Sequence, residues 1–236
     1  MAKAKIRYVC TSCGSVSSRW LGRCPQCGEW NTMAEETVTP EAPKAAQSMA
    51  RSGPSSQATS LSDIALEDMT RVETGIGELD RVLGGGIVPG ALILLSGDPG
   101  IGKSTLVLQL AAAVCAKNGA VLYGSGEESA GQIKLRAQRL GIAAPNLVIQ
   151  ADTSLDNILS EAHKRRPALV IVDSIQTMYS QSVEGTPGSL SQIREGTSRL
   201  MTFAKSEAIP VIVIGHVTKD GAIAGPRMME HMVDVV

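Results

Sequence analysis

The feature that most constrains this chain is a short glycine-rich run between a segment with strand character and a segment with helix character. The run is Gly97-Asp98-Pro99-Gly100-Ile101-Gly102-Lys103-Ser104. It matches the pattern G-x-x-x-x-G-K-[ST] at every fixed position. Such glycines let backbone N–H groups curl around phosphate oxygens, and the start of the next helix adds a positive dipole. The sequence therefore predicts a phosphate-binding loop here, and we reject the alternative of a chance glycine-rich turn.

The residues at the end of this loop predict ATP and Mg²⁺ as ligands. Lys103 would reach the β- and γ-phosphates, and the hydroxyl of Ser104 would bind Mg²⁺. Thr105 could assist, in a role that the pattern does not define.

The rest of the chain from about residue 61 alternates apolar strand patterns with helical patterns. Expected strands cover 91–96, 120–125, 147–150, 168–173 and 210–215, and expected helices cover 103–117, 129–140, 155–165 and 189–207. With 43% hydrophobic residues but only 3% aromatic ones, the core would be built from aliphatic side chains. This pattern predicts an α/β fold with a parallel sheet flanked by helices.

Polar residues follow three of these expected strands, where they would meet at the carboxyl edge of the sheet. Asp173 ends 168–173 and could hold the Mg²⁺ water shell, although a capping Asp would look the same. Glu127 or Glu128 could orient and deprotonate the attacking water, with Glu127 preferred, but glutamates are also common at helix N-termini. His216 could sense the γ-phosphate, or be only a solvated loop residue; His163 and His231 are expected to be structural.

Four of the five cysteines form two CxxC pairs near the N-terminus, and the fifth, Cys115, lies alone in an alanine-rich stretch. The pairs are Cys10, Cys13 and Cys24, Cys27, each followed by glycine. Two such knuckles can present four thiolates to Zn²⁺, whereas a redox CxxC usually occurs singly. A segment of about 33 residues cannot bury enough core to fold unaided, so zinc would supply the stability.

Composition divides the chain into a zinc-ribbon module at 1–33, a flexible linker at 34–60 and an ATPase core at 61–236. The module carries Lys and Arg residues together with Trp20 and Trp30. These two indoles could stack on bases, but we expect them to form the small core of the module. The net charge of −1 gives no support for nucleic-acid binding by the chain as a whole. No apolar stretch reaches the length of a membrane helix, which favours a cytoplasmic protein.

Taken together, these segments resemble the bacterial RadA (Sms) family of DNA-repair ATPases along essentially the whole chain. A run that starts at Thr74-Gly75 and passes Leu79-Asp80 and Leu83-Gly84-Gly85-Gly86 to Pro89-Gly90 is shared with other RecA-like ATPases, including KaiC-type proteins. The zinc ribbon, GEES at 126–129, VDSIQT at 172–177 and GHVTKDG at 215–221 narrow the resemblance to RadA.

The resemblance implies a RecA-like core that forms a ring. It also implies an ATP-driven motor that binds single-stranded and branched DNA, promotes branch migration of recombination intermediates, and works with a RecA-type recombinase. Lys103, Ser104, Asp173 and one of the two glutamates would take the ATPase roles. The loops at 176–188 and 217–227 would face DNA, which suggests Lys219 and Arg227 as contacts. The family continues with a Lys-Asn-Arg-Phe-Gly motif and a Lon-like domain, and neither occurs in these residues.

Two other functions remain open on the sequence. One is a nucleotide-switched module that recruits a partner through the zinc ribbon, and the other is a KaiC-like signalling ATPase that does not bind DNA.

Overall fold

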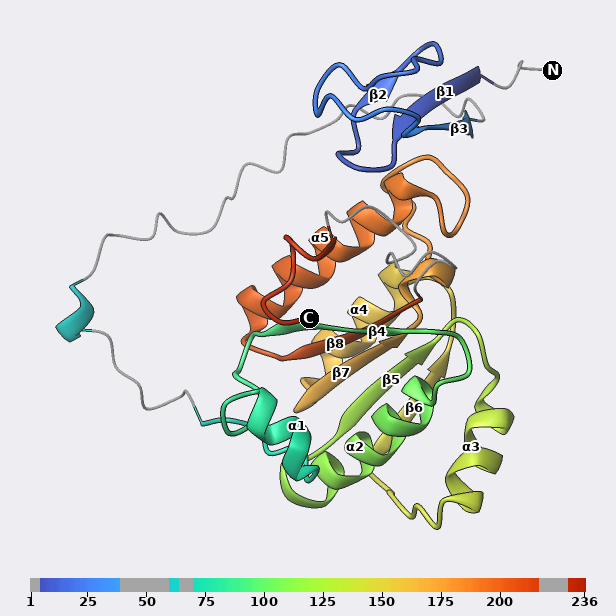
Figure 1. Cartoon of the computed structure of the whole chain (residues 1–236). Coiled ribbons are helices and arrows are strands. Elements are labelled where there is room, and N and C mark those ends of the chain that lie inside the picture. Colours follow the sequence, from blue (N-terminus) through green and yellow to red (C-terminus); the bar gives the residue numbers. More distant parts are fainter. Residues whose placement is uncertain (1–4, 39–59, 64–69, 217–228) are drawn as a thin grey trace.

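The computed structural model describes residues 5–38, 60–63, 70–216 and 229–236 (Figure 1). Its main element is a five-stranded sheet in the order β4-β8-β7-β5-β6, in which every neighbouring pair is parallel. The strands are β4 (Leu92–Gly97), β5 (Val121–Ser125), β6 (Leu147–Ala151), β7 (Leu169–Asp173) and β8 (Val211–His216). The predicted α/β class with a parallel sheet is confirmed, and each expected strand is present within about one residue of its predicted bounds.

Helices cover both faces of this sheet and give it three layers. The helices are α1 (Gly77–Val82), α2 (Lys103–Lys117), α3 (Ala130–Arg139), α4 (Leu155–Arg165) and α5 (Leu190–Glu207), with short 3-10 turns η1 (Leu61–Asp63) and η2 (Ile175–Thr177). One core cluster joins α4 and α5 to the sheet face that includes Leu122 and Val170. The other joins α2 and α3 to the face that includes Tyr123 and Ile171. Because side chains alternate along a strand, both faces are apolar, as a covered parallel sheet requires.

Local sequence explains where the helices begin. Ser129 caps α3 by accepting a hydrogen bond from the N–H of Gln132, and the side chain of Gln132 accepts from the N–H of Ser129. Ser154 caps α4 by accepting from the N–H of Asn157. These are ordinary N-caps, and they fix the turn that follows β5 and the turn that follows β6. The short helix α1 (Gly77–Val82) was not among the helices expected from the sequence.

Within the segment 229–236, Asp234 and Val235 lie beside the edge strand β4. Val235 forms a parallel bridge with Ile93, and the N–H of Asp234 donates to the carbonyl of Leu92 at 2.9 Å. The carboxylate of Asp234 also accepts from the N–H of Leu92 at 2.7 Å and from Lys205 of α5 at 2.8 Å. Residues 234 and 235 therefore extend the edge of the sheet beside β4.

The N-terminal module is a three-stranded antiparallel sheet in the order β2-β1-β3. Its strands are β1 (Lys5–Cys10), β2 (Val16–Ser17) and β3 (Met33–Val38). All six residues of β1 pair with β3. Residues 34–38, which were expected in the linker, therefore belong to the module.

One expectation for this module is wrong. Trp20 and Trp30 do not form its core, because their exposed fractions are 55% and 69%. The buried cluster consists instead of Cys10, Cys24 and Met33, with Tyr8, Cys13 and Leu21 packed around it. So small a unit has little interior, and Cys10, Cys24 and Met33 occupy it in place of the two indole rings. In the described part of the chain, no helix is long and apolar enough to cross a membrane.

Candidate nucleotide site and zinc centre

Most of the candidate catalytic residues lie at one edge of the main sheet. Gly97 at the end of β4 pairs in register with His216 at the end of β8, and Ser125 at the end of β5 pairs with Asp173 at the end of β7. These four strands are neighbours, so their carboxyl ends form one continuous rim. Residues that are far apart in the sequence are thereby brought to the place where α/β sheets bind ligands.

The predicted phosphate-binding loop connects β4 to α2 on this rim. Gly100 and Gly102 have φ angles of 81° and 105°, a left-handed backbone conformation that favours glycine. Gly102 is the N-cap residue of α2, so Lys103 and Ser104 begin the helix with N–H groups that have no partner within it. Thr105 follows in the same turn. Such a helix start, preceded by a turn of this kind, can bind phosphate oxygens.

Lys103 is buried at the base of the loop, with an exposed fraction of only 7%. Its ammonium donates to the carbonyl oxygens of Gly97 at 2.8 Å and Asp98 at 2.9 Å. A buried ammonium needs such acceptors or an anion beside it. The Lys103 ammonium is therefore held against the backbone of the loop that would surround a phosphate.

Asp173 is almost fully buried at the end of β7, and Tyr123 of β5 holds one of its oxygens. The hydroxyl of Tyr123 donates to Oδ2 of Asp173 at 2.5 Å. Burial first, and then the neighbouring Asp173 carboxylate, raise the pKa of Tyr123, so its hydroxyl remains a donor. The other oxygen, Oδ1, is also buried and has no hydrogen-bond partner among the described residues.

This unpaired carboxylate oxygen fits the Mg²⁺ site that the sequence predicts. A buried charged oxygen without a donor is costly, and a hydrated cation is one way to satisfy it. Carboxylate, hydroxyl and water oxygens are the ligands that Mg²⁺ prefers. Asp173 and the hydroxyl of Ser104 therefore form a suitable donor set.

Glu127 lies just beyond β5 and contacts residues from both of the next two strands along the rim. Its Oε1 accepts from the hydroxyl of Ser174 and lies 2.8 Å from Nε2 of His216. Partial burial alone would raise the pKa of the Glu127 carboxyl. The hydrogen bonds with Ser174 and His216 and the positive charge of Lys103 together outweigh burial, so the pKa is lowered. Glu127 is therefore an ionised carboxylate, 34% exposed, that is fixed in place beside the loop.

Glu128 points to a different partner. Its carboxylate pairs with Arg136 of α3, one turn or more into the helix, and its N–H donates to Ser125. The structure thus brings Glu127 together with His216, and engages Glu128 in an ion pair with the helix that follows.

Two residues of this rim were missed by the sequence reasoning. Ser174 follows Asp173 directly, but nothing in the sequence indicates that its hydroxyl reaches Glu127. Tyr123 precedes Ser125 by two positions and so lies on the same face of β5; only the pairing of β5 with β7 shows that it reaches Asp173. Lys219 and Arg227, and the loop 217–227 as a whole, lie outside the described residues.

The four N-terminal cysteines come together as predicted. All four sulfurs lie within 4.8 Å of one another, with 3.7 Å from Cys10 to Cys27 and 3.5 Å from Cys13 to Cys24. Four sulfurs at about 2.3 Å from a tetrahedral zinc would lie about 3.8 Å apart, so the spacing fits Zn²⁺.

Backbone geometry supports the same metal. Gly14 and Gly28 have φ angles of 72° and 77°, and each donates its N–H to the carbonyl of the first cysteine in its pair. The pKa of the Cys24 thiol is lowered to about 6. The main cause is a hydrogen bond from the backbone N–H of Cys27 to the Cys24 sulfur, and the N–H of Gln26 has a smaller effect in the same direction. Burial, in contrast, raises the pKa of Cys13 to about 12, and a bound metal ion is what deprotonates a coordinating thiol of that kind.

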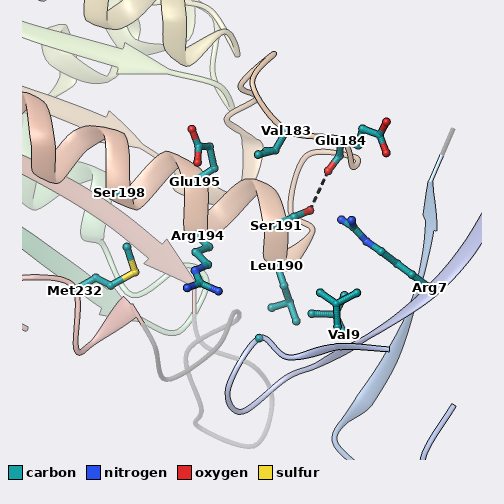
Figure 2. A pocket seen from close by; sticks show the side chains of 12 residues that line it. Arg7, Val9, Val183, Glu184, Leu190, Ser191, Arg194, Glu195, Ser198 and Met232 are labelled. Carbon is teal, nitrogen blue, oxygen red and sulfur yellow. Dashed lines mark hydrogen bonds between the residues drawn. The ribbon is translucent and has the colours of Figure 1, made fainter. Parts of the chain in front are cut away.

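A cavity of about 640 Å³ lies between the zinc module and the core. Figure 2 shows Arg7 and Val9 of β1 on one side, facing Leu190 and Ser191 at the start of α5. The hydroxyl of Ser191 donates to the carbonyl of Glu184 at 3.0 Å and ties the preceding loop to the helix. None of residues 97–105 lines this cavity.

Comparison with known proteins gives matches for both parts of the chain. Residues 58–222 match the family described as AAA domain, and residues 8–35 match the family described as rubredoxin metal binding domain. Among solved structures, the ATPase domain of G40P aligns with a TM-score of 0.59, covering 71% of this chain and 75% of that one. At 17% identity, this likeness concerns the fold alone.

Curated relatives match the entire chain. DNA repair protein RadA of Bacillus subtilis is 48% identical, that of Listeria monocytogenes 49% and that of Campylobacter jejuni 48%, each over 100% of this chain. The alignments cover 52%, 52% and 53% of those proteins, so the chain spans about half the length of the curated relatives it matches. With a RecA-like AAA-type core, an N-terminal zinc ribbon and this degree of identity, the chain belongs to the AAA domain family and, within it, to the bacterial RadA family.

Proposed function

We propose that this chain binds and hydrolyses ATP, and that it serves as the ATPase part of a DNA-repair motor that acts on single-stranded and branched DNA. The observation that carries the proposal is the rim itself. Lys103, Asp173, Glu127 and His216 come from four different segments and meet at the ends of neighbouring strands. Each has the chemistry that one step of phosphoryl transfer requires.

In this proposal the loop 97–104 binds the phosphates through its N–H groups, and Lys103 exchanges its backbone carbonyl acceptors for β- and γ-phosphate oxygens. Mg²⁺ bound by Ser104 and Asp173 would neutralise charge on the same phosphates. Glu127 orients a water molecule, whose oxygen attacks the γ-phosphorus while the bond to the β–γ bridging oxygen breaks. The proton of the water passes to Glu127, and ADP and phosphate are released. Ser174 and His216 hold the Glu127 carboxylate for this role.

The DNA part of the proposal rests on the RadA family and on charge. Residues 176–188 contain Glu184 and no Lys or Arg. Basic contacts to a phosphate backbone would therefore come from the other expected DNA-facing segment, with Lys219 and Arg227. We include in the proposal branch migration, a homo-oligomeric ring of the longer protein and cooperation with a RecA-type recombinase.

The test is ATP hydrolysis by the 236-residue chain with and without single-stranded DNA. Lys103→Ala should abolish nucleotide binding, whereas Lys117→Ala should leave it unchanged, because Lys117 is exposed at the far end of the same helix and pairs with Glu73. Replacing both Lys219 and Arg227 by Ala should remove DNA stimulation and preserve the basal rate. Hydrolysis that persists in Lys103→Ala would contradict the proposed site.

A second function, recruitment of a partner through the zinc ribbon, is favoured by a specific observation. Trp20 and Trp30 are exposed on either side of Gly22, and the guanidinium of Arg23 lies 5.8 Å from the ring centre of Trp30. Exposed Trp and Arg side chains are typical of binding surfaces. If recruitment is the main role, Trp20→Ala together with Trp30→Ala abolishes partner binding and leaves ATP hydrolysis and its DNA response intact. A KaiC-like ATPase would show hydrolysis without any DNA response.

A further inference from the structure

Tyr123 is the described residue that donates to the buried carboxylate of Asp173. Its side chain is 1% exposed, and its hydroxyl lies 2.5 Å from Oδ2. In the register of β5 with β7, Tyr123 pairs with Ile171, so Tyr123 and Asp173 lie diagonally on the same face of the sheet. That face is covered by α2, the helix that begins with Lys103 and Ser104.

The two oxygens of Asp173 therefore have different surroundings. Oδ2 accepts the phenol hydrogen bond, whereas Oδ1 is buried and has no partner in the described ranges. A carboxylate can rotate about its Cβ–Cγ bond: a half-turn only exchanges two equivalent oxygens, but a smaller rotation would turn Oδ1 away from the direction of a bound cation. A donor fixed on a rigid central strand prevents that rotation, because the Tyr123 ring is packed within the core cluster between α2, α3 and the sheet.

We propose that Tyr123 is a positioning residue of the metal site, whose hydroxyl holds Oδ2 so that Oδ1 stays directed to the hydrated cation. The inference rests on the proposed function, since it concerns the same Mg²⁺–nucleotide site. Residues that orient metal ligands typically affect metal affinity or activity by about 10- to 100-fold. Tyr123 acts through Asp173 and does not touch the nucleotide in this scheme.

The test uses Tyr123→Phe, which removes the hydroxyl and keeps the ring. Two quantities are measured on the whole chain: the affinity for ADP in the presence of EDTA, and the affinity of the ADP complex for Mn²⁺, followed by electron paramagnetic resonance. We expect unchanged ADP affinity without metal and Mn²⁺ binding weakened by about tenfold. The ATPase rate should recover in part at high Mg²⁺ concentration.

Two controls separate positioning from loss of packing. Leu122→Val removes a methylene from the residue just before Tyr123 in β5. Leu122 lies on the opposite face of the sheet, so this change should leave Mn²⁺ affinity unchanged. In an Asp173→Asn chain, adding Tyr123→Phe should have no further effect on Mn²⁺ binding, because the carboxylate that Tyr123 positions is gone.

The outcomes are distinct. Equal Mn²⁺ affinity for Tyr123→Phe and the parent, or an equal loss in Leu122→Val, overturns the positioning role and leaves the proposed ATPase intact. If Tyr123→Phe does not fold, 3-fluorotyrosine incorporated at position 123 keeps the ring and the hydroxyl but makes the phenol a stronger donor; Mn²⁺ affinity equal to that of the parent then overturns the role, and a changed affinity supports it. A parent chain that binds neither ADP nor Mn²⁺–ADP overturns both proposals.

Discussion

Oε1 of Glu127 lies 2.8 Å from Nε2 of His216, although 89 positions separate these residues in the sequence. The contact crosses the end of β7, because β7 lies between β5 and β8 in the sheet. Ser174, which follows β7, donates to the same oxygen of Glu127. The ends of three neighbouring strands thus meet at one carboxylate: Glu127 follows β5, and the two side chains that contact it, Ser174 and His216, come from the ends of β7 and β8.

This arrangement predicts different results for the two neighbouring glutamates. Glu127→Gln should lower the ATP hydrolysis rate by about 100-fold or more, the usual size of a lost general base, and preserve ATP binding. Glu128→Gln should retain most of the rate, because Glu128 pairs with Arg136. Steady-state rates and nucleotide titrations measure both. A larger loss of rate for Glu128→Gln than for Glu127→Gln would reverse the assignment.

The zinc centre predicts a loss that is confined to the N-terminal module. Cys24→Ser removes one of four ligands, so bound zinc should fall from one per chain to less than about a tenth of that, since a small metal site is folded by its metal. The core cluster contains none of the module's residues, and ATP binding should persist. Zinc content by atomic emission and nucleotide titration check this. Cys115→Ala, a change in α2 away from the zinc cluster, should keep all the zinc.

The sequence predicted the main fold because its signals are local. Each buried strand is an aliphatic run, and the loop 97–104 stands between one such run and a helix, so neither depends on knowing the partner strands. The expected positions of Asp173 and His216 at strand ends follow from the same patterns. The pairing of the strands is not local, however, and it alone determines that Tyr123 reaches Asp173 and that Ser174 reaches Glu127.

The zinc module shows the same limit in another form. The spacing of the cysteines predicted the metal cluster, whereas the exposure of Trp20 and Trp30 follows from how little interior the module has, which Cys10, Cys24 and Met33 occupy. Apolar character alone suggested a core role, and the small size of the module prevented it. β3 was missed because Met-Ala-Glu-Glu-Thr-Val has little strand pattern of its own, and its pairing with β1 stabilises it.

Acidic pH should weaken the contacts that hold the loop at 176–188, which follows β7, against the helices α4 and α5. A hydrogen bond from Arg199 is the main cause that lowers the pKa of Asp156, and the N–H of Gln181 also donates to it. Because the folded pKa lies below the unfolded one, this stabilisation is fully present above the usual aspartate pKa of about 3.9 and is lost as pH falls through the folded value. Asp156 is 39% exposed, so the contribution is at most about 1 kcal/mol.

Thermal unfolding between about pH 6 and pH 3 measures this dependence. Asp156→Asn should lower the melting temperature near neutral pH and flatten the decline on the acid side. Asp63→Asn, on the exposed turn η1, makes the same change in net charge and should leave the profile as it is in the parent. Parallel profiles for Asp156→Asn and the parent would show that this carboxylate does not contribute.

Gly126, just before Glu127, should not tolerate a side chain. A Cβ atom built there would lie 2.3 Å from Oγ1 and 2.9 Å from Cβ of Thr177, and the N–H of Gly126 is held by the carbonyl of Asp173 at 2.9 Å. Gly126→Ala must therefore displace η2 or the start of the Glu127 turn, at a cost of about 1–3 kcal/mol. Since a shift of about 1 Å in a catalytic group can lower a rate by about 100-fold, we expect hydrolysis to fall by tenfold or more.

Gly131 provides the matched control, because it lies five residues further along in α3, where a Cβ atom would have its nearest neighbour at 4.0 Å. Gly131→Ala should stabilise the protein by up to about 0.5 kcal/mol, less than in the middle of a helix because Gly131 is in the first turn of α3, and leave the rate unchanged. Denaturant unfolding and steady-state hydrolysis measure both variants. If Gly126→Ala were as stable and as active as Gly131→Ala, the close contact between the Glu127 turn and η2 would not exist in solution, and the position assigned to Glu127 would have to be abandoned.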